Sequence, residues 1–336
     1  MKKEYDLWID FTNPPHVNLY KSFLNDFEKN NLTFFSTSRE FVETEGLLKK
    51  YAIDFNSFGK HGGSNKLSKL FQLLKRDFKL YWNVPNFRYS ISSSFEAAQV
   101  SWLRRRKSIF FDDNEIAPNW LYGKFCSHVL IPNCINPVLF EKSGISLKKI
   151  IPYNGFKENI YLADYIPDNS FLNEIPFNEF VVVRPENTKA AYVSSEASSI
   201  VPELIDELTK EGLNILFLPR YESDKNLISN SKNVFSPSLP INGLDACFYS
   251  SGVFTGAGTM AREAAILGKP SFSFFANSEL LSVDKKMISD GILYHSRSPK
   301  DLINNFIKSK HREFKIEKSK AVKNEVVSIL LELLKS

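Results

Sequence analysis

Two polar corners, each between a strand-like run and a helix-like run, constrain the fold of this chain most strongly. The first is DFTNPPH, from Asp10 to His16, and the second is GAGTMARE, from Gly256 to Glu263. Each stands where a parallel strand would end and a helix would begin, and α/β proteins bind ligands at that end of a strand. Two such corners far apart in the sequence predict two α/β lobes with a cleft between them.

The length and composition agree with two globular lobes. The chain has 336 residues, more than a single hydrophobic core usually supports, with 43% hydrophobic and 24% charged residues. No apolar run reaches the roughly 18 to 20 residues that cross a bilayer, and the start MKKEYDLWID lacks the apolar core of a signal peptide. We therefore expect a cytoplasmic protein. Three cysteines without a CxxC motif predict neither a disulfide framework nor a metal site.

Strand-like and helix-like runs alternate along the chain, which is the pattern of parallel, doubly wound sheets. The expected strands cover residues 5–9, 32–36, 53–58, 87–92, 108–111 and 128–132, and then 180–184, 214–219, 253–255 and 271–275. Helices are expected near residues 195–211, 259–267, 280–290 and 316–334. We predict a first Rossmann-like lobe over residues 1–153, a proline-containing connection over 154–178, a second Rossmann-like lobe over 179–315 and a closing helix over 316–336.

The first corner predicts a place for a catalytic base. Asn13-Pro14-Pro15 makes a stiff turn, because each proline fixes its own φ and restricts the residue before it. His16 would then begin a helix, where unpaired amides favour an anion and an imidazole can serve as general base or phosphate donor. The alternative is that His16 only caps the turn.

An acidic cluster follows the expected strand over residues 108–111. Its members Asp112, Asp113 and Glu115 would point toward the cleft. A carboxylate near a second acid can have a raised pKa, which suits a base that deprotonates an acceptor hydroxyl. The alternative is a solvated loop with helix-capping acids. The ligands are too local to specify a metal, and none is expected.

The second corner predicts a phosphate site. Glycines let the backbone approach a ligand closely, and the amides of the turn and the following helix would hold a diphosphate. The residues concerned are Gly256, Ala257, Gly258, Thr259 and Met260. Glu263 lies one helical turn after Thr259 and would accept hydrogen bonds from a ribose. Two alternatives stay open: a purely structural glycine turn, and a dinucleotide site of the GxGxxA type with Glu279 as its acid.

Two arginines are expected at the same edge of the second sheet. Arg184 in VVVRPE and Arg220 in FLPR each end an apolar strand, and guanidinium groups bind diphosphates through forked hydrogen bonds. The alternative is that Arg184 merely pairs with Glu186. In the first lobe, the acceptor side of the cleft is expected to include Asn13, His61, Gly62 and Asn154.

The charge balance favours anionic ligands without indicating nucleic acid. The net charge is +5, and the sequence has no zinc-finger spacing, RNA-recognition signature or helix-turn-helix pattern. One stretch could contact a membrane. Its apolar stripe is Leu67, Leu70, Phe71, Leu74, Phe78 and Tyr81, flanked by Lys66, Lys69, Lys75, Arg76 and Lys79. The main interpretation is an ordinary helix packed on the sheet with solvated lysines, and the alternative is peripheral contact with an anionic membrane.

Seven motifs occur in order from Ile9 to Pro270: IDFTNPPHVNLYK, GKHGG, FDDNE, YNGFKE, VVVRPE, LPR and GAGTMAREAAILGKP. Together they resemble an archaeal and bacterial family of unknown function, domain of unknown function 354, over nearly the whole chain. That family is similar to the GT-B superfamily, which includes the glycosyltransferase that completes lipid II and the non-hydrolysing UDP-N-acetylglucosamine 2-epimerase. The resemblance implies two Rossmann-like lobes, with an acceptor site mainly in the first and a sugar nucleotide mainly in the second.

The resemblance also implies roles for two residues. His16 resembles the first-lobe histidine of the lipid II enzyme, and Glu263 resembles the ribose-binding glutamate of the second lobe. The chain departs from the family pattern at Ile116, where a histidine usually follows FDDNE, and at Ser92-Ser93, near a usual histidine-glycine pair.

The combined expectation is a metal-independent, cofactor-free glycosyltransferase of polysaccharide or cell-envelope biosynthesis. It would move a sugar from a nucleoside diphosphate, UDP first among them, to a hydroxyl of a surface-glycan or lipid-linked precursor. It would work in the cytoplasm or at the inner face of the membrane. A sugar-nucleotide epimerase or hydrolase, and a non-catalytic protein that binds nucleotide sugars, remain as alternatives.

Overall fold

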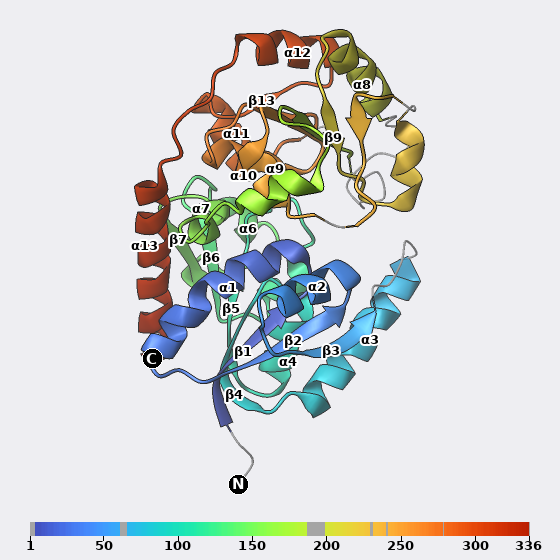
Figure 1. Cartoon of the computed structure of the whole chain (residues 1–336). Coiled ribbons are helices and arrows are strands. Elements are labelled where there is room, and N and C mark those ends of the chain that lie inside the picture. Colours follow the sequence, from blue (N-terminus) through green and yellow to red (C-terminus); the bar gives the residue numbers. More distant parts are fainter. Residues whose placement is uncertain are drawn as a thin grey trace. The chain divides into compact units, whose positions relative to one another are not determined.

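The computed structural model describes residues 4–60, 66–186, 199–228, 231–239, 241–277 and 279–335. The chain forms two compact units (Figure 1). Unit 1 comprises Met1–Asp164 and Lys318–Ser336, and unit 2 comprises Tyr165–Glu317. The expected connection over 154–178 is thus divided between the two units, and most of the C-terminal helix belongs to unit 1.

Unit 1 contains a seven-stranded parallel sheet in the order β3-β2-β1-β4-β5-β6-β7. Its strands are β1 (Glu4–Phe11), β2 (Phe34–Glu40), β3 (Asn56–Lys60), β4 (Asn86–Ser92), β5 (Lys107–Phe111), β6 (His128–Pro132) and β7 (Ile150–Tyr153). The helices between them are α1 (Pro14–Lys29), α2 (Val42–Lys50), α3 (Lys66–Asn83), α4 (Phe95–Leu103), α5 (Trp120–Gly123), α6 (Val138–Glu141) and α7 (Lys157–Leu162), with the 3-10 helix η1 (Leu147–Lys149).

Unit 2 contains a six-stranded parallel sheet in the order β10-β9-β8-β11-β12-β13. Its strands are β8 (Val181–Arg184), β9 (Ile215–Phe217), β10 (Val234–Phe235), β11 (Gly252–Thr255), β12 (Ser271–Ser273) and β13 (Tyr294–His295). Its helices are α8 (Val201–Lys210), α9 (Gly243–Tyr249), α10 (Gly258–Ile266), α11 (Ser282–Ser289) and α12 (Pro299–Lys308), with the 3-10 helices η2 (Asn169–Glu174) and η3 (Glu222–Leu227). The final helix, α13, covers Ile316–Lys335.

The two sheets confirm the α/β class and the alternation of strands and helices predicted from the sequence. The strand interiors are apolar because both faces of a parallel sheet are covered by helices. In unit 1, Trp8 of β1 packs with Phe87 of β4 and with Leu80 of α3. In unit 2, the strand residues Val181 and Phe254 share a core with Leu204 of α8.

Three strands were not predicted. β10 and β13 have two residues each, too short for a hydrophobic pattern to identify. β7 contains Pro152, and no strand was expected over its residues. A proline is accepted there because β7 is the edge strand of its sheet.

The helix α13 is held to unit 1 by charged contacts. Lys323 donates to Asp26 of α1 at 3.0 Å and to Asp164 at 2.6 Å. Val326 and Leu330 of α13 are fully buried. Among the described residues, no helix has the length and apolar character needed to cross a membrane.

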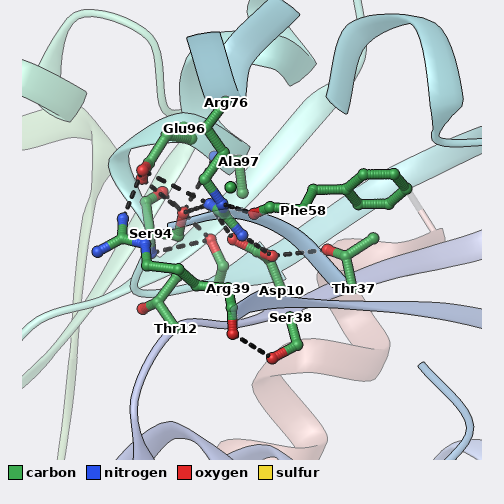
Figure 2. Close-up of polar contacts among 12 residues, drawn as sticks. Asp10, Thr12, Thr37, Ser38, Arg39, Phe58, Arg76, Ser94, Glu96 and Ala97 are labelled. Carbon is green, nitrogen blue, oxygen red and sulfur yellow. Dashed lines mark hydrogen bonds and ion pairs between the residues drawn. The ribbon is translucent and has the colours of Figure 1, made fainter. Parts of the chain in front are cut away.

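A buried ion pair crosses the interior of unit 1 (Figure 2). The guanidinium of Arg76 in α3 donates to Asp10 of β1 through two nitrogens, at 2.7 and 3.0 Å, and both residues are at most 1% exposed. Arg76 also donates to the carbonyl of Phe58 at 2.8 Å. Burial alone would lower the pKa of Arg76, but the carboxylates of Asp10 and Glu96 raise it. Arg76 is thus an interior residue, unlike the lysines with which the sequence analysis groups it, and its partner lies on a strand 66 positions away in the sequence.

We predict that Arg76→Gln lowers the free energy of unfolding by about 3 to 5 kcal/mol, because it leaves the Asp10 carboxylate buried without its cation. Urea denaturation measures this. The control is Arg88→Gln, whose pair with Asp6 is long, at 3.5 Å, and half exposed on the arginine side; it should change stability by less than about 1 kcal/mol. Equal effects of the two variants would show that burial does not govern the pair.

Candidate functional site

Each sheet has a point where the strand order reverses, and polar corners stand at both points. In unit 1 the reversal lies between β1 and β4, and in unit 2 between β8 and β11. Ligands of open α/β sheets bind outside the carboxyl ends of the strands at such a point. The corner from Asp10 to His16 follows β1, and the corner from Gly256 to Glu263 follows β11.

His16 lies in the first turn of α1 with its side chain buried. Pro14 begins the helix, and the side chain of Asn13 caps it by accepting from the backbone N–H of His16 at 3.2 Å. The capping group is therefore Asn13, and the His16 imidazole is left for other contacts. Its Nδ1 lies 2.9 Å from Oγ1 of Thr12. In the tautomer that donates Nδ1–H to Thr12, Nε2 keeps its lone pair and can accept a proton.

The surroundings of His16 keep its imidazole neutral. Burial and, next, the nearby ammonium of Lys157 lower the pKa of His16 to about 3, against the carboxylate of Asp113, which raises it. Lys157 and Asp113 form an ion pair of 2.7 Å with both side chains largely buried. Lys157 is the first residue of α7, and Asp113 follows β5. His16, Lys157 and Asp113 therefore share one electrostatic environment at the carboxyl end of the sheet.

Asp112 also belongs to the predicted acidic cluster. It accepts from the hydroxyl of Tyr122 at 2.5 Å and from the backbone N–H of Asn114 at 2.9 Å. Burial raises the pKa of Asp112 to about 7, against the lowering effect of these two hydrogen bonds. Glu115 lies further along the same loop and is half-buried. Asp112 can thus exchange a proton near neutral pH, as a general base must.

A second charged group stands beside the switch point of unit 1 (Figure 2). Glu96, in the first turn of α4, is 2% exposed. Its carboxylate lies 2.5 Å from the guanidinium of Arg39, a residue of β2. Burial would raise the pKa of Glu96, but the guanidinium groups of Arg76 and Arg39 hold it at about 2. Ser94 caps α4 and donates its hydroxyl to Glu96 at 3.0 Å. A permanently ionised carboxylate, held by two arginines, therefore fixes the start of α4 beside β1.

The remaining residues predicted for unit 1 have different outcomes. His61 and Gly62 lie outside the described residues. Asn154 is fully engaged: it donates its side-chain amide to Glu325 of α13 at 2.9 Å and accepts from Asn133 at 2.8 Å. The structure thus gives Asn154 a part in holding α13 against unit 1.

In unit 2 the switch point brings Arg184 and the glycine corner together. Arg184 ends β8, and its Cα is paired in register with Thr255, the last residue of β11. The backbone N–H of Gly256 donates to the carbonyl of Arg184 at 3.0 Å. A Cβ on Gly256 would lie 2.6 Å from the Cα of Glu186, so only glycine allows the two strand ends to approach this closely.

The helix α10 begins directly after this corner and leaves its first amides without a side-chain cap. Its N-cap residue is Ala257, which has no side-chain hydrogen-bond acceptor, and its first residues are Gly258, Thr259 and Met260. The amides of a first helical turn point out of the helix and favour an anion. Met260 itself is buried at 6% exposure, so only its backbone is suited to a ligand contact.

Two charged neighbours shift the pKa of Arg184 in opposite directions. Burial and, next, the guanidinium of Arg220 lower the pKa of Arg184 to about 10, against the carboxylate of Glu263, which raises it. Arg220 follows β9 and donates Nε–H to the carbonyl of Pro185 at 3.1 Å. Glu263 is a buried residue of α10. Two like-charged guanidiniums held near one another are stabilised by an anion between them.

The alternative partner for Arg184 is contradicted. Glu186 accepts from Nη1 of Arg297 at 2.7 Å and from the hydroxyl of Ser199 at 2.7 Å. Within the part of the chain that the structure describes, no hydrogen bond or ion pair joins Glu186 to Arg184. The pairing with Arg297 was not predicted, because the two residues are 111 positions apart.

The dinucleotide alternative is also disfavoured by the strand order. The GxGxxA run follows β11, the fourth strand of its sheet, whereas the fingerprint belongs after the first. Its proposed acid, Glu279, is 69% exposed on its side chain and lies 3.7 Å from Lys285.

Sequence reasoning missed three charged residues of these corners. Lys157 stands in the YNGFKE motif, which was noted without a role for its lysine. Arg262, in the GAGTMARE corner, is buried and pairs with Asp284 of α11 at 3.0 Å. Arg39 lies in β2 with no motif to mark it. Across the described ranges, no group of three or more His, Cys, Asp or Glu side chains is arranged to hold a metal ion.

We predict that the stability of the protein falls on acidification partly through His16. The folded pKa, about 3, is below the ordinary value of 6.5, so between these values the unfolded chain binds a proton that the folded chain does not, and stability is lost as the pH falls. Between pH 7 and pH 5 this amounts to about 2 kcal/mol, and His16→Gln should remove it. Urea denaturation at both pH values measures the difference. The control His128→Gln, at a less buried histidine on β6, should keep most of the wild-type loss; a His16→Gln variant with an unchanged loss would contradict the assignment of a neutral buried imidazole.

Comparison of the whole chain with known proteins identifies its fold and its family. An uncharacterised protein of Methanocaldococcus jannaschii is 30% identical over 313 residues, which cover 89% of this chain and 90% of that protein. The UDP-GlcNAc 2-epimerase from Neisseria meningitidis, solved bound to UDP-GlcNAc, matches with a TM-score of 0.72 and 12% identity over 99% of this chain and 100% of that one. The glycotransferase of kitacinnamycin matches with a TM-score of 0.58 and 10% identity over 99% of both chains. The fold is therefore the GT-B-like fold of these enzymes. The profile of the family described as "Protein of unknown function (DUF354)" matches residues 5–335, and the chain belongs to that family.

Proposed function

We propose that the protein is a glycosyltransferase of the GT-B type that transfers a sugar from a UDP-sugar to a hydroxyl group. The observation that carries the proposal is the register of Arg184 against Thr255, which sets the residue Arg184 beside the strand end that leads into the uncapped start of α10. Guanidinium groups and free amides are the donors that a diphosphate accepts from. The likeness to a solved structure that holds UDP-GlcNAc supports a nucleotide sugar as the ligand.

The nucleotide is assigned to unit 2. Arg184, Arg220 and the amides from Gly256 to Thr259 would hold the diphosphate and offset its growing negative charge as the anomeric C–O bond breaks. The carboxylate of Glu263, on the same helix, would accept hydrogen bonds from the ribose. No metal ion is needed in this scheme, because arginines and amides supply the positive field.

The base is assigned to unit 1. Nε2 of His16 would accept the proton of the acceptor hydroxyl while that oxygen forms the new bond to the anomeric carbon and UDP departs. A neutral imidazole is the form that can accept a proton, and the low pKa of His16 keeps it so. The carboxylate of Asp113 would stabilise the imidazolium that forms, and the ammonium of Lys157 would favour its return to the neutral state. Asp112 or Glu115 is the alternative base.

The acceptor is assigned to the class of surface-glycan or lipid-linked precursors. Asn13, His61 and Gly62 are proposed to lie on the acceptor side. An enzyme with such a substrate works in the cytoplasm, where UDP-sugars are made, and meets the membrane in peripheral contact.

A sugar-nucleotide 2-epimerase is the second candidate, favoured by the TM-score with the Neisseria meningitidis epimerase. The two reactions differ in what they need. A transferase consumes its UDP-sugar only when an acceptor is present, whereas an epimerase or hydrolase converts it alone. Incubation of the protein with a panel of UDP-sugars, followed by chromatography, separates them: no conversion without acceptor is expected, and conversion by wild type that His16→Gln abolishes would establish the second candidate.

We predict that Arg184→Gln weakens UDP binding by about 10- to 100-fold and leaves uridine binding nearly unchanged, because a charged hydrogen bond to phosphate is worth about 1.5 to 3 kcal/mol. Glu263→Gln should weaken UDP and uridine alike, since the ribose is common to both. Isothermal titration calorimetry measures the four affinities. The matched control is Arg88→Gln, at an exposed arginine of unit 1. If Arg184→Gln weakens uridine as much as UDP, the arginine does not bind phosphate.

A further inference from the structure

The helix α3 presents its apolar stripe outward instead of toward the sheet. The side chains that form it are Phe71 at 64% exposure, Leu74 at 57%, Phe78 at 68%, Tyr81 at 36% and Trp82 at 69%. Positions three and four apart lie on one face of a helix, so these residues make a continuous strip. We call them the α3 strip. The expectation that this stripe packs on the sheet is wrong for Phe71, Leu74, Phe78 and Tyr81. The side chains of Leu67 and Leu70 lie outside the part that the structure describes.

The opposite face of α3 explains the reversal. Arg76 and Leu80 are buried, at 1% and 0% exposure. Leu80 packs with Trp8, and the Arg76 guanidinium reaches Asp10 (Figure 2). The helix is thus anchored through a buried ion pair and a narrow apolar contact. Its larger apolar side chains remain outside, where Trp82 packs against Phe78, with ring centroids 6.3 Å apart, and against Tyr81, at 5.2 Å.

An exposed strip of this size is uncommon on a protein that has no partner for it. Single exposed apolar residues are normal, but a contiguous apolar patch marks a site of protein or membrane contact. The strip combines Phe, Leu, Tyr and Trp, which are the residues that interfacial helices bury at the boundary between headgroups and acyl chains. Tyr and Trp in particular prefer that boundary because their rings are amphipathic.

Basic side chains lie within the span of the strip. Lys75 is exposed and Lys79 half-buried, and Asp77 is the single acid of α3. Burial raises the pKa of Asp77 to about 8, and the carboxylates of Glu96 and Asp10 act in the same direction against the guanidinium of Arg76. Asp77 is therefore mostly uncharged at neutral pH.

A second basic run adjoins the end of α3. Arg104 donates to the carbonyl of Val84, directly after the helix, at 2.8 Å, and to Asn86 at 3.0 Å. It begins the run Arg104-Arg105-Arg106-Lys107, which follows the exposed Trp102 and Leu103 of α4. Basic residues around an apolar strip complement the negative potential of an anionic bilayer.

We propose that the α3 strip docks on an anionic lipid bilayer, with its aromatic side chains entering the interface and the surrounding lysines and arginines contacting the headgroups. The occupant is a membrane and not a protein groove, because the strip lies on a convex helix with basic residues beside it and at its end. This inference is independent of the reaction proposed above, and it would hold for a transferase or an epimerase.

Vesicle flotation tests the proposal. The full-length protein is mixed with phosphatidylcholine vesicles that contain zero or 40% phosphatidylglycerol (about that fraction of anionic lipid gives a strong surface potential). We expect wild type to float with the anionic vesicles and at least about tenfold less with the neutral ones or at high salt. The variant Phe78→Ser/Trp82→Ser should remove the binding, and Lys75→Glu/Lys79→Glu should reduce it at least about tenfold.

The matched control is Val42→Ser/Ile307→Ser, which removes two exposed apolar side chains, at 81% and 61% exposure, outside α3. It should bind anionic vesicles as wild type does. Because all the substituted side chains are exposed or at the surface, the variants should keep the wild-type melting temperature. Equal binding by wild type and the α3 variants, or no binding by wild type, would overturn the proposal.

Tryptophan fluorescence provides a second readout at the strip itself. The chain has four tryptophans, and Trp102→Phe/Trp120→Phe leaves only buried Trp8 and exposed Trp82. Anionic vesicles should shift the emission to the blue, and brominated lipids should quench it. Sedimentation without lipid tests a second copy as the occupant: a dimer that Phe78→Ser/Trp82→Ser converts to monomer, together with unquenched Trp82, would assign the strip to self-association and overturn membrane docking.

Discussion

The parallel pairing of β8 with β11 is the constraint on which the proposed nucleotide site depends. The register sets Thr255 beside Arg184, and the strand order reverses at this pair, so the chains leaving the two strands diverge and expose the start of α10. Gly256 makes the approach possible, because any side chain there would collide with the backbone of Glu186. The site is thus built from backbone geometry first, and Arg184, Arg220 and Glu263 add charge to it.

Unit 1 has the same reversal of strand order, between β1 and β4. Its switch point is stabilised by charge inside the protein: Arg76 neutralises Asp10, and Arg76 and Arg39 together hold Glu96 ionised. This network and the buried side chain of Leu80 hold α3 to unit 1. The larger apolar side chains of the helix are not part of that contact, and they form the α3 strip at the surface. The internal ion pair and the exposed strip are therefore two consequences of one arrangement.

Much of the fold could be predicted from the sequence, and part of the candidate site could. The apolar runs and the two corners identify parallel sheets, and the rule that ligands meet the carboxyl ends of strands is sufficient to bring Arg184 and Gly256 together. Ion pairs between residues far apart in the sequence could not be predicted. Lys157 pairs with Asp113 only once α7 has packed, and Glu186 pairs with Arg297 only in the folded unit 2. Periodicity identified α3 as amphipathic but could not tell which face is covered, because that depends on the Asp10 carboxylate beneath Arg76.

Hydrogen exchange with and without UDP tests the central claim most directly, because the claim concerns backbone amides. If the diphosphate binds at the start of α10, UDP should slow exchange of the amides of Gly258, Thr259 and Met260, which have no acceptor within the helix. Uridine at equal saturation should leave those three amides unchanged. Binding of UDP with unaltered exchange at α10, and with protection at the corner of β1 and α1 instead, would contradict the account.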